Sequence, residues 1–306
     1  MSIAARPLPA FTLKQLAYLV AAADSGTIAG AATRLNVSPS ALSDAITELE
    51  TAIQEQLCVR RRAHGLTLTP SGDRVVAHAR RMLAEADELA RAVGGTDTLS
   101  GPIVIGCYPT LAPTVLPRLL REFGAEHPHV DLTIREATQC QLADDIAAGR
   151  VDVAFVYDML VPPETERVQL AAFPAHVVLT ADHPLADRDT VRLADLVDDD
   201  LILLDAPPSS EHTLSVFAAQ GLTPRVRHRT SSYEVVRTLV ARGLGYGILV
   251  SRVSNPRSYE GLPLVAKPIE PPVRPVAIDM IWAPNRPVPA RTRAFIGFAR
   301  GLDWGA

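Results

Sequence analysis

Short polar side chains gather at the start of one predicted helix. Ser38 can accept a hydrogen bond from a free N–H of the first turn, and Pro39 suits the first helical position, where no N–H partner is needed. Apolar residues then recur every three or four positions and share one face; they are Leu42, Ile46, Leu49 and Ile53. The opposite face begins with Pro39, Ser40, Ser43, Asp44 and Thr47. Such short side chains would let the start of the helix enter a deep groove.

A second amphipathic segment, residues 27–35, ends just before this helix. Two helices joined by so short a turn form a helix-turn-helix, whose second helix enters the major groove of DNA. Helical hairpins that bind no DNA share this spacing, so other features must decide. Thr12 and Gln15 open an earlier helix as a capping box, and an arginine run precedes a short strand at 66–69. Three helices and a basic two-stranded wing favour DNA binding. The candidate DNA contacts on the second helix are Ser38, Pro39, Ser40, Ser43 and Asp44. Outside this helix, the candidates are Arg34, Arg60, Arg61, Arg62 and His64.

This N-terminal region resembles the DNA-binding domain of LysR-type transcriptional regulators. The matching residues are Leu13-x-x-Leu16-x-x-Leu19, Ala31-Ala32-x-x-Leu35, Ser38 to Ser43 with Ile46, Leu49-Glu50, and Leu66-Thr67-Leu68-Thr69-Pro70-x-Gly72. The sequence departs from the family at Pro39-Ser40, where Gln-Pro is usual, and at Asp44-Ala45, where Arg-Gln is common. Asp44 could accept a hydrogen bond from a cytosine amino group, but a solvent-facing or intramolecular role is favoured. The operator sequence therefore does not transfer from relatives.

The composition is that of a soluble globular protein of two or three domains, with 306 residues, 47% hydrophobic and 21% charged. No apolar run approaches a membrane span and no signal peptide is visible, so we expect a cytoplasmic protein that binds no membrane. Residues 1–95 hold ten Lys/Arg and nine Asp/Glu, a charge of +1 within a total of −4. The positive charge that DNA binding needs must therefore be concentrated at Arg34 and Arg60 to Arg62.

A long helix is predicted from Pro70 to about Val93. Its apolar residues step alternately by four and three positions; they are Val75, Ala79, Met82, Ala86, Leu89 and Val93. This is the seam of helices that pair, although a single helix lying on its own domain would show similar spacing. Dimerisation is favoured because one helix-turn-helix binds only half of an operator. We expect a homodimer or homotetramer.

From Gly101 onward, predicted strands alternate with helices, which indicates a parallel sheet with crossover helices. Two such α/β series with a late return strand at 276–282 resemble the periplasmic-binding-protein-like effector domain of the same family. The segments that carry this resemblance are Gly106 to Thr110, His183-Pro184-Leu185-Ala186, and Val240-x-x-Gly243-x-Gly245-x-Gly247-Ile248.

The expected fold is thus an α/β chain with an α-rich winged helix-turn-helix, a long linker helix and a two-lobed effector domain. The expected bounds are 1–69 for the DNA-binding domain, 70–95 for the linker helix and 96–306 for the effector domain. Within the effector domain, we expect lobe I to comprise 101–172 and 275–306, and lobe II 173–274.

Hydroxyl residues follow several predicted strands, where ligands of open α/β sheets bind. Helix starts there offer free N–H groups that suit an anion, so a small, anionic effector between the lobes is one interpretation. The alternative is that these residues merely cap helices. The resemblance to the family makes Thr110 the strongest candidate for an effector contact. The candidate effector contacts are Tyr108, Pro109, Thr110, Glu136, Thr138, Tyr157, Pro207, Ser209, Thr230, Ser231 and Ser232.

Other chemistry is not indicated. The sequence shows no paired histidine spacing for a metal, no nucleophile elbow and no strand-first nucleotide loop, so no cofactor and no enzymatic activity are predicted. Cys107 and Cys140 are interpreted as buried structural thiols, since peroxide-sensing relatives place their pair in the second lobe. The sequence favours an effector-responsive transcription regulator; the alternative is a cytoplasmic solute-binding or metabolic protein with a helical assembly domain.

Overall fold

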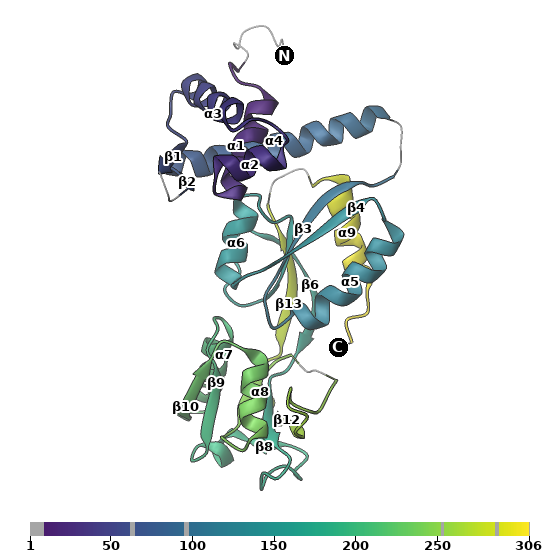
Figure 1. Cartoon of the computed structure of the whole chain (residues 1–306). Coiled ribbons are helices and arrows are strands. Elements are labelled where there is room, and N and C mark those ends of the chain that lie inside the picture. Colours follow the sequence, from purple (N-terminus) through teal and green to yellow (C-terminus); the bar gives the residue numbers. More distant parts are fainter. Residues whose placement is uncertain (1–8, 62–64, 95–97, 252–253, 285–287, 306) are drawn as a thin grey trace. The chain divides into compact units, whose positions relative to one another are not determined.

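The computed structural model of this chain describes residues 9–61, 65–94, 98–251, 254–284 and 288–305. Two compact units are present, one built mainly from the residues before Ser100 and the other mainly from Ser100 onward. Figure 1 labels their helices and strands. None of the described helices is both long and apolar enough to cross a membrane.

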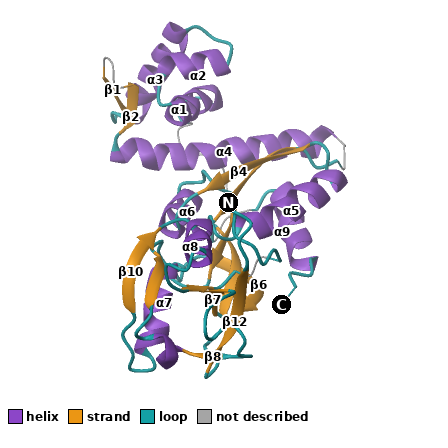
Figure 2. Ribbon diagram, turned by 60° about the horizontal axis from the view of Figure 1, so that its bottom comes forward, coloured by secondary structure: helices purple, strands orange, loops and turns teal. Residues whose placement is uncertain are grey.

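The first unit is a bundle of helices with a small β-hairpin (Figure 2). Its elements are α1 (Leu13–Ser25), α2 (Ile28–Arg34), α3 (Pro39–Ile53), β1 (Cys58–Arg61), β2 (Gly65–Leu68) and α4 (Pro70–Gly94). The predicted helix starts are confirmed: Thr12 and Gln15 form a capping box, and Thr27 and Ser38 cap α2 and α3. The apolar faces of α1, α2 and α3 meet in one core with residues of the hairpin and of α4.

Two local features fix the hairpin against the helices. The Glu50 carboxylate at the end of α3 accepts hydrogen bonds from the backbone N–H groups of Leu57 at 2.8 Å and Cys58 at 3.1 Å. Gly72 lies so close to the same turn that a Cβ there would stand 1.9 Å from the Leu57 carbonyl oxygen. Only glycine fits this approach, which explains why the Pro70-x-Gly72 pattern follows the strand.

The two halves of α4 differ in burial. Val76 is buried and Ala79 is only 1% exposed, because both belong to the core of the first unit. Met82 and Leu89 are 41% and 68% exposed. The first turns thus lie on their own domain, as the alternative interpretation held, whereas Met82 and Leu89 further along remain exposed. The side chain of Val93 lies outside the described residues.

Lobe I of the second unit is a five-stranded sheet of order β4-β3-β5-β13-β6 with helices beside it. Its elements are β3 (Gly101–Cys107), α5 (Ala112–Glu126), β4 (Val130–Glu136), α6 (Gln139–Ala147), β5 (Val153–Tyr157), β6 (Glu166–Phe173), β13 (Val276–Trp282) and α9 (Ala290–Gly301). The parallel arrangement expected from the sequence holds for β3, β4 and β5. The late return strand β13 pairs antiparallel with β5 and β6, because the chain re-enters lobe I from lobe II along this strand.

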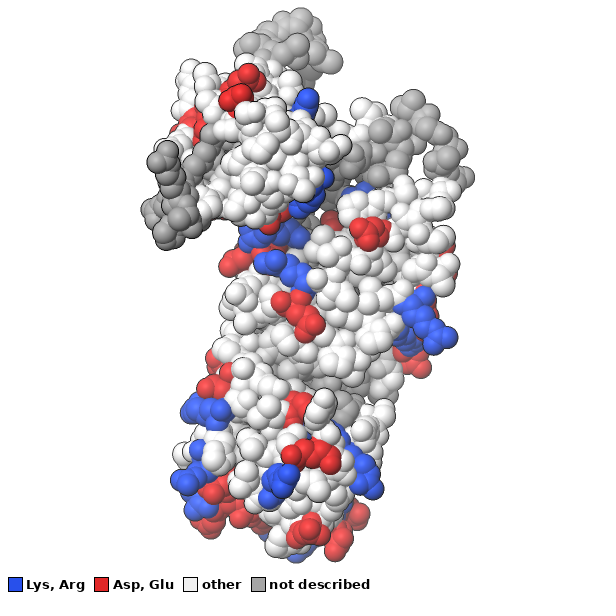
Figure 3. All heavy atoms as spheres, in the orientation of Figure 1, with Lys and Arg blue, Asp and Glu red and all other residues white. Residues whose placement is uncertain are grey.

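Lobe II holds a four-stranded sheet of order β11-β7-β12-β8 and a parallel pair β10-β9. Its elements are β7 (His176–Thr180), β8 (Val191–Arg192), the 3-10 turn η1 (Leu193–Leu196), β9 (Asp200–Leu204), α7 (Ser209–Ala218), β10 (Arg225–Thr230), α8 (Tyr233–Ala241), β11 (Gly247–Leu249) and β12 (Leu264–Glu270). A bridge between Leu201 and Tyr246 joins the two sets of strands. The visible face of lobe II mixes both signs of charge (Figure 3), in keeping with ion pairs such as Arg242–Glu260.

Candidate DNA-binding surface and effector site

The start of α3 presents short polar side chains to solvent. Ser38 Oγ accepts a hydrogen bond from the Ala41 N–H at 3.2 Å and lies 3.2 Å from Ser40 Oγ. Pro39 and Ser40 are exposed, whereas Leu42, Ile46 and Leu49 on the other face are completely buried. The buried face anchors the helix in its domain, so the polar end is held rigidly and remains accessible.

The charged residues around α3 are less favourable to a polyanion. Asp44 is exposed, while Ser43 is half-buried. Arg34 Nη2 lies 3.5 Å from Asp24 Oδ2 in an exposed ion pair, which contributes little and is screened by salt. Arg34 can therefore exchange Asp24 for a phosphate at small cost.

The wing consists of β1 and β2 and carries two of the predicted arginines. Arg60 and Arg61 lie on β1, opposite Leu66 and Gly65 on β2. The side chains of these arginines, and Arg62 and His64 as a whole, lie outside the described residues. Their contact with phosphate stays a prediction.

Four of the predicted effector residues converge between the lobes. The Tyr108 hydroxyl donates a hydrogen bond to the Ala206 carbonyl at 3.0 Å and lies 3.3 Å from Ser209 Oγ. The Thr110 and Tyr157 hydroxyls lie 3.1 Å apart, and the two tyrosine rings meet edge to face with centroids 5.5 Å apart. We call Tyr108, Thr110, Tyr157 and Ser209 the interlobe cluster.

The interlobe cluster is closed. Burial raises the pKa of both Tyr108 and Tyr157 above that of an ordinary tyrosine. The cavity lined by Thr110, Tyr157 and Ser209 measures only about 10 Å³, roughly the space of one water molecule. A larger ligand could enter only if the lobes separated and the Tyr108–Ala206 bond broke.

The other predicted effector residues do not line this cavity. Thr138 and Ser232 act as helix caps, since their hydroxyls accept the N–H groups of Gln141 and Val235, both at 3.4 Å. The capping alternative thus describes these two correctly. Thr230 Oγ1 accepts the Ser232 N–H at 3.2 Å. The remaining ones, Pro109, Glu136, Pro207 and Ser231, are exposed.

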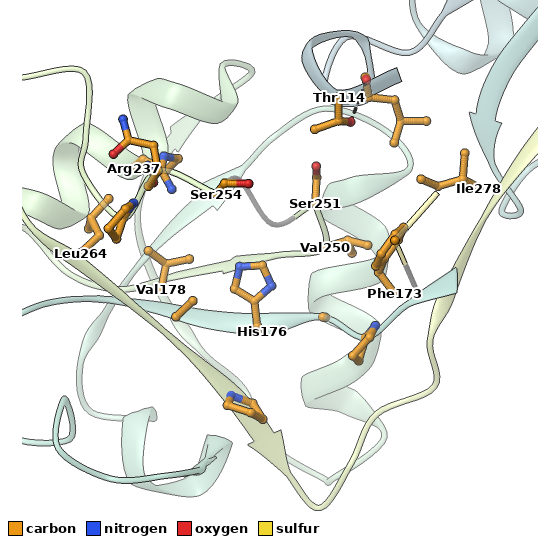
Figure 4. Close-up of a pocket in the computed structure, with 18 of the residues that line it drawn as sticks. Thr114, Phe173, His176, Val178, Arg237, Val250, Ser251, Ser254, Leu264 and Ile278 are labelled. Atoms are coloured by element: carbon orange, nitrogen blue, oxygen red, sulfur yellow. Dashed lines mark hydrogen bonds between the residues drawn. The ribbon is translucent and has the colours of Figure 1, made fainter. Parts of the chain in front are cut away.

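A much larger pocket, of about 630 Å³, opens elsewhere between the lobes (Figure 4). We call it the β7–β12 pocket because its floor is formed by these strands, with His176, Val178, Leu264 and Ala266 among its lining residues. Thr114 on α5 and Ile278 on β13 contribute from lobe I. The sequence did not predict it, because its residues are mostly apolar or small and come from many separate elements. No local motif marks them.

One of the two cysteines agrees with its interpretation as buried and the other does not. Cys107 is buried, and its pKa is raised, first by burial and then by the charge of Glu136. Cys140 was expected to be buried and is exposed, because it lies on the outer side of α6, away from buried Leu142. In the described part of the chain, no three His, Cys, Asp or Glu side chains are grouped to hold a metal ion.

Two family models match nearly the whole chain. The model described as "LysR substrate binding domain" matches residues 96–303. The model described as "Bacterial regulatory helix-turn-helix protein, lysR family" matches residues 13–73.

Individual relatives agree with these models. The crystal structure of HinK, a LysR family transcriptional regulator from Pseudomonas aeruginosa, is 31% identical and covers 95% of this chain and 98% of its own, with a TM-score of 0.64. The crystal structure of the C-terminal domain of a probable LysR family transcriptional regulator from Rhodococcus sp. RHA1 is 45% identical and covers 66% of this chain and 99% of its own, with a TM-score of 0.64. The transcriptional dual regulator OxyR of Escherichia coli is 28% identical over 286 residues, which are 91% of this chain and 92% of OxyR.

Proposed function

Because this chain belongs to the LysR family of transcriptional regulators, we propose that it binds operator DNA through α3 and the wing and adjusts that binding when a small effector occupies its second unit. The observation that carries the proposal is the start of α3, where Ser38, Pro39 and Ser40 are exposed above a completely buried apolar face. In this proposal, residues 1–69 bind DNA, 70–95 form the linker helix and 96–306 bind the effector in a cytoplasmic protein.

The second half of α4 supports pairing of two chains. Met82 and Leu89 leave apolar side chains in solvent, seven residues apart on one helical face. An antiparallel or parallel partner helix would cover them and bring two copies of α3 onto two half-sites of an inverted repeat. A homodimer is the smallest assembly that meets this need, and a homotetramer would pair two such dimers.

The interlobe cluster supports a role in effector response. It is the place where lobe I, through Tyr108, holds lobe II by a hydrogen bond to the Ala206 carbonyl. An effector that separates or tightens the lobes must change this contact. We therefore assign Thr110, Tyr157 and Ser209 to the effector-sensing site, together with the surrounding residues predicted from the sequence.

A gel-retardation assay with the full chain tests the DNA-binding part. The probe is the DNA upstream of the chain's own coding sequence, compared with a scrambled duplex of the same length and composition at each salt concentration. Tighter retardation of the natural sequence at every salt concentration is expected. Equal retardation would favour a solute-binding or metabolic protein whose helical N-terminus serves assembly.

A further inference from the structure

The β7–β12 pocket is large enough to hold a small molecule as it stands. Its volume of about 630 Å³ falls in the range of roughly 300–1,000 Å³ that ligand pockets occupy. The cavity at the interlobe cluster, at about 10 Å³, does not. Of these two cavities, the β7–β12 pocket is therefore the one that can accept a molecule without separation of the lobes.

Strand pairing determines which side chains form the floor of this pocket. His176 and Val178 of β7 stand opposite Pro268 and Ala266 of β12, and directly opposed residues in an antiparallel pair share one face. Figure 4 shows His176 directed toward the segment that carries Ser251 and Ser254. The floor is thus apolar with one imidazole, and it faces two hydroxyls.

The charge of the pocket argues against a strongly anionic ligand. Its buried cation, Arg237, is already paired with Glu234 at 2.8 Å and donates to the carbonyl oxygens of Asn255 and Arg257 at 2.9 and 2.6 Å. Lys267 borders the pocket, but it stands opposite Val177, whose side chain belongs to the core on the other face of the sheet. Among the described residues that line the pocket, no unpaired cation stands on its floor, and burying an anion there without one would be costly.

We propose that the β7–β12 pocket binds the effector, and that the effector is a compact, mainly apolar molecule with one hydrogen-bonding group and no strong negative charge. This inference rests on the proposed function, in which an effector occupies the second unit, and it revises the anionic effector expected from the sequence. The Ser251 and Ser254 hydroxyls supply the hydrogen-bonding partners, while His176, Val178, Leu264 and Ile278 contact the rest of the molecule.

Shared lining residues explain how a ligand bound in the β7–β12 pocket affects the interlobe cluster. Tyr157 and Ser251 line both the pocket and the small cavity beside it. Tyr157 is bonded to Thr110, and the Tyr233 hydroxyl donates to the Ser251 carbonyl. A ligand that displaces the Tyr157 ring thus acts on the residues that hold the two lobes together.

Two fluorescent probes with the same ring framework test the ligand class on the full chain. N-phenyl-1-naphthylamine is uncharged, and 1-anilinonaphthalene-8-sulfonate adds one sulfonate. The uncharged probe should bind saturably with one site per chain and at least tenfold more tightly than the sulfonate. Equal or tighter binding of the sulfonate would overturn the proposed ligand class.

Two variants test where the uncharged probe binds. Ala266→Phe fills the β7–β12 pocket and should weaken the uncharged probe at least tenfold. Ala219→Phe is the matched control, because Ala219 lines a separate pocket of about 460 Å³ beside α7. If Ala266→Phe binds like wild type, or if Ala219→Phe abolishes binding, the assignment is wrong.

Circular dichroism and thermal melting identify a variant that fails to fold, and Val178→Phe then replaces Ala266→Phe with the same expected result. Gel retardation of the same variants separates the two proposals. If the pocket variants change probe binding as expected but the wild-type chain causes no retardation of DNA, the assignment of the pocket stands and the proposed function is rejected.

Discussion

The start of α3 and the interlobe cluster are both rich in hydroxyl residues, yet these residues are exposed in one and buried or half-buried in the other. At α3, Ser38 caps the helix and its hydroxyl lies 3.2 Å from that of Ser40, and both serines stay exposed. In the interlobe cluster, the hydroxyls of Thr110 and Tyr157 bond each other and that of Tyr108 bonds Ala206. Hydroxyl residues are thus accessible to a ligand only where the fold leaves them exposed.

The largest expected effect on DNA binding comes from substitutions in α4, which leave the start of α3 unchanged. Met82→Glu combined with Leu89→Lys places charges on the exposed apolar side of α4, where a paired helix would bury them. The double variant should be monomeric in sedimentation and should lose operator affinity about a hundredfold or more, because half-site binding is no longer cooperative. A fully dimeric double variant would show that α4 does not pair through these residues.

The double variant Arg60→Ala/Arg61→Ala tests whether the wing contacts DNA phosphates. Each lost phosphate contact removes about 0.9 from the slope of log affinity against log salt, so the pair should flatten it by about 1.8. Between 50 and 200 mM salt, wild type should then lose roughly tenfold more affinity than the variant. The ranking of operator variants should not change. An unaltered slope in fluorescence anisotropy titrations would remove the wing arginines from the interface.

Thr110→Val tests whether the interlobe cluster is as closed as its geometry indicates. The change leaves the buried Tyr157 hydroxyl without its partner, which should cost about 1–3 kcal/mol of unfolding free energy. Adding Tyr157→Phe removes the unpaired group and should recover most of this loss. Chemical denaturation of Thr110→Val, Tyr157→Phe, the double variant and wild type completes the double-mutant cycle. Additive losses would mean that the two hydroxyls do not interact.

Tyr108→Phe should have the smallest effect. It removes the hydrogen bond to the Ala206 carbonyl but keeps the ring packed against Tyr157, so a loss of about 0.5–1.5 kcal/mol is expected. The melting temperature of the second unit should fall by a few degrees. A rise in melting temperature would indicate that the bond between the lobes is strained.

Local sequence patterns predicted the first unit well because its helix starts depend on neighbouring residues. Thr12, Thr27 and Ser38 each bond an N–H three residues ahead, so their roles follow from sequence spacing alone. The strands β6 and β12 were not predicted, since β12 carries Lys267 and Pro268, and both strands are defined by partners far along the chain.

The effector region was predicted only in part for the same reason. The sequence identified Tyr108, Thr110, Tyr157 and Ser209, which meet across the lobes. It could not show that they bond one another rather than face an open cleft. It also gave no sign of the β7–β12 pocket, whose floor depends on the register between His176 and Pro268.

The central claim is that the exposed start of α3 reads DNA, and one pair of variants tests it most directly. Ser40→Glu places a negative charge at that end, and Thr51→Glu places the same charge on the exposed C-terminal part of the same helix. In gel retardation on the DNA upstream of the chain's own coding sequence, Ser40→Glu should lose at least tenfold in affinity and Thr51→Glu should stay within about twofold of wild type. Equal affinities for the two variants would contradict the assignment of α3 as the recognition helix.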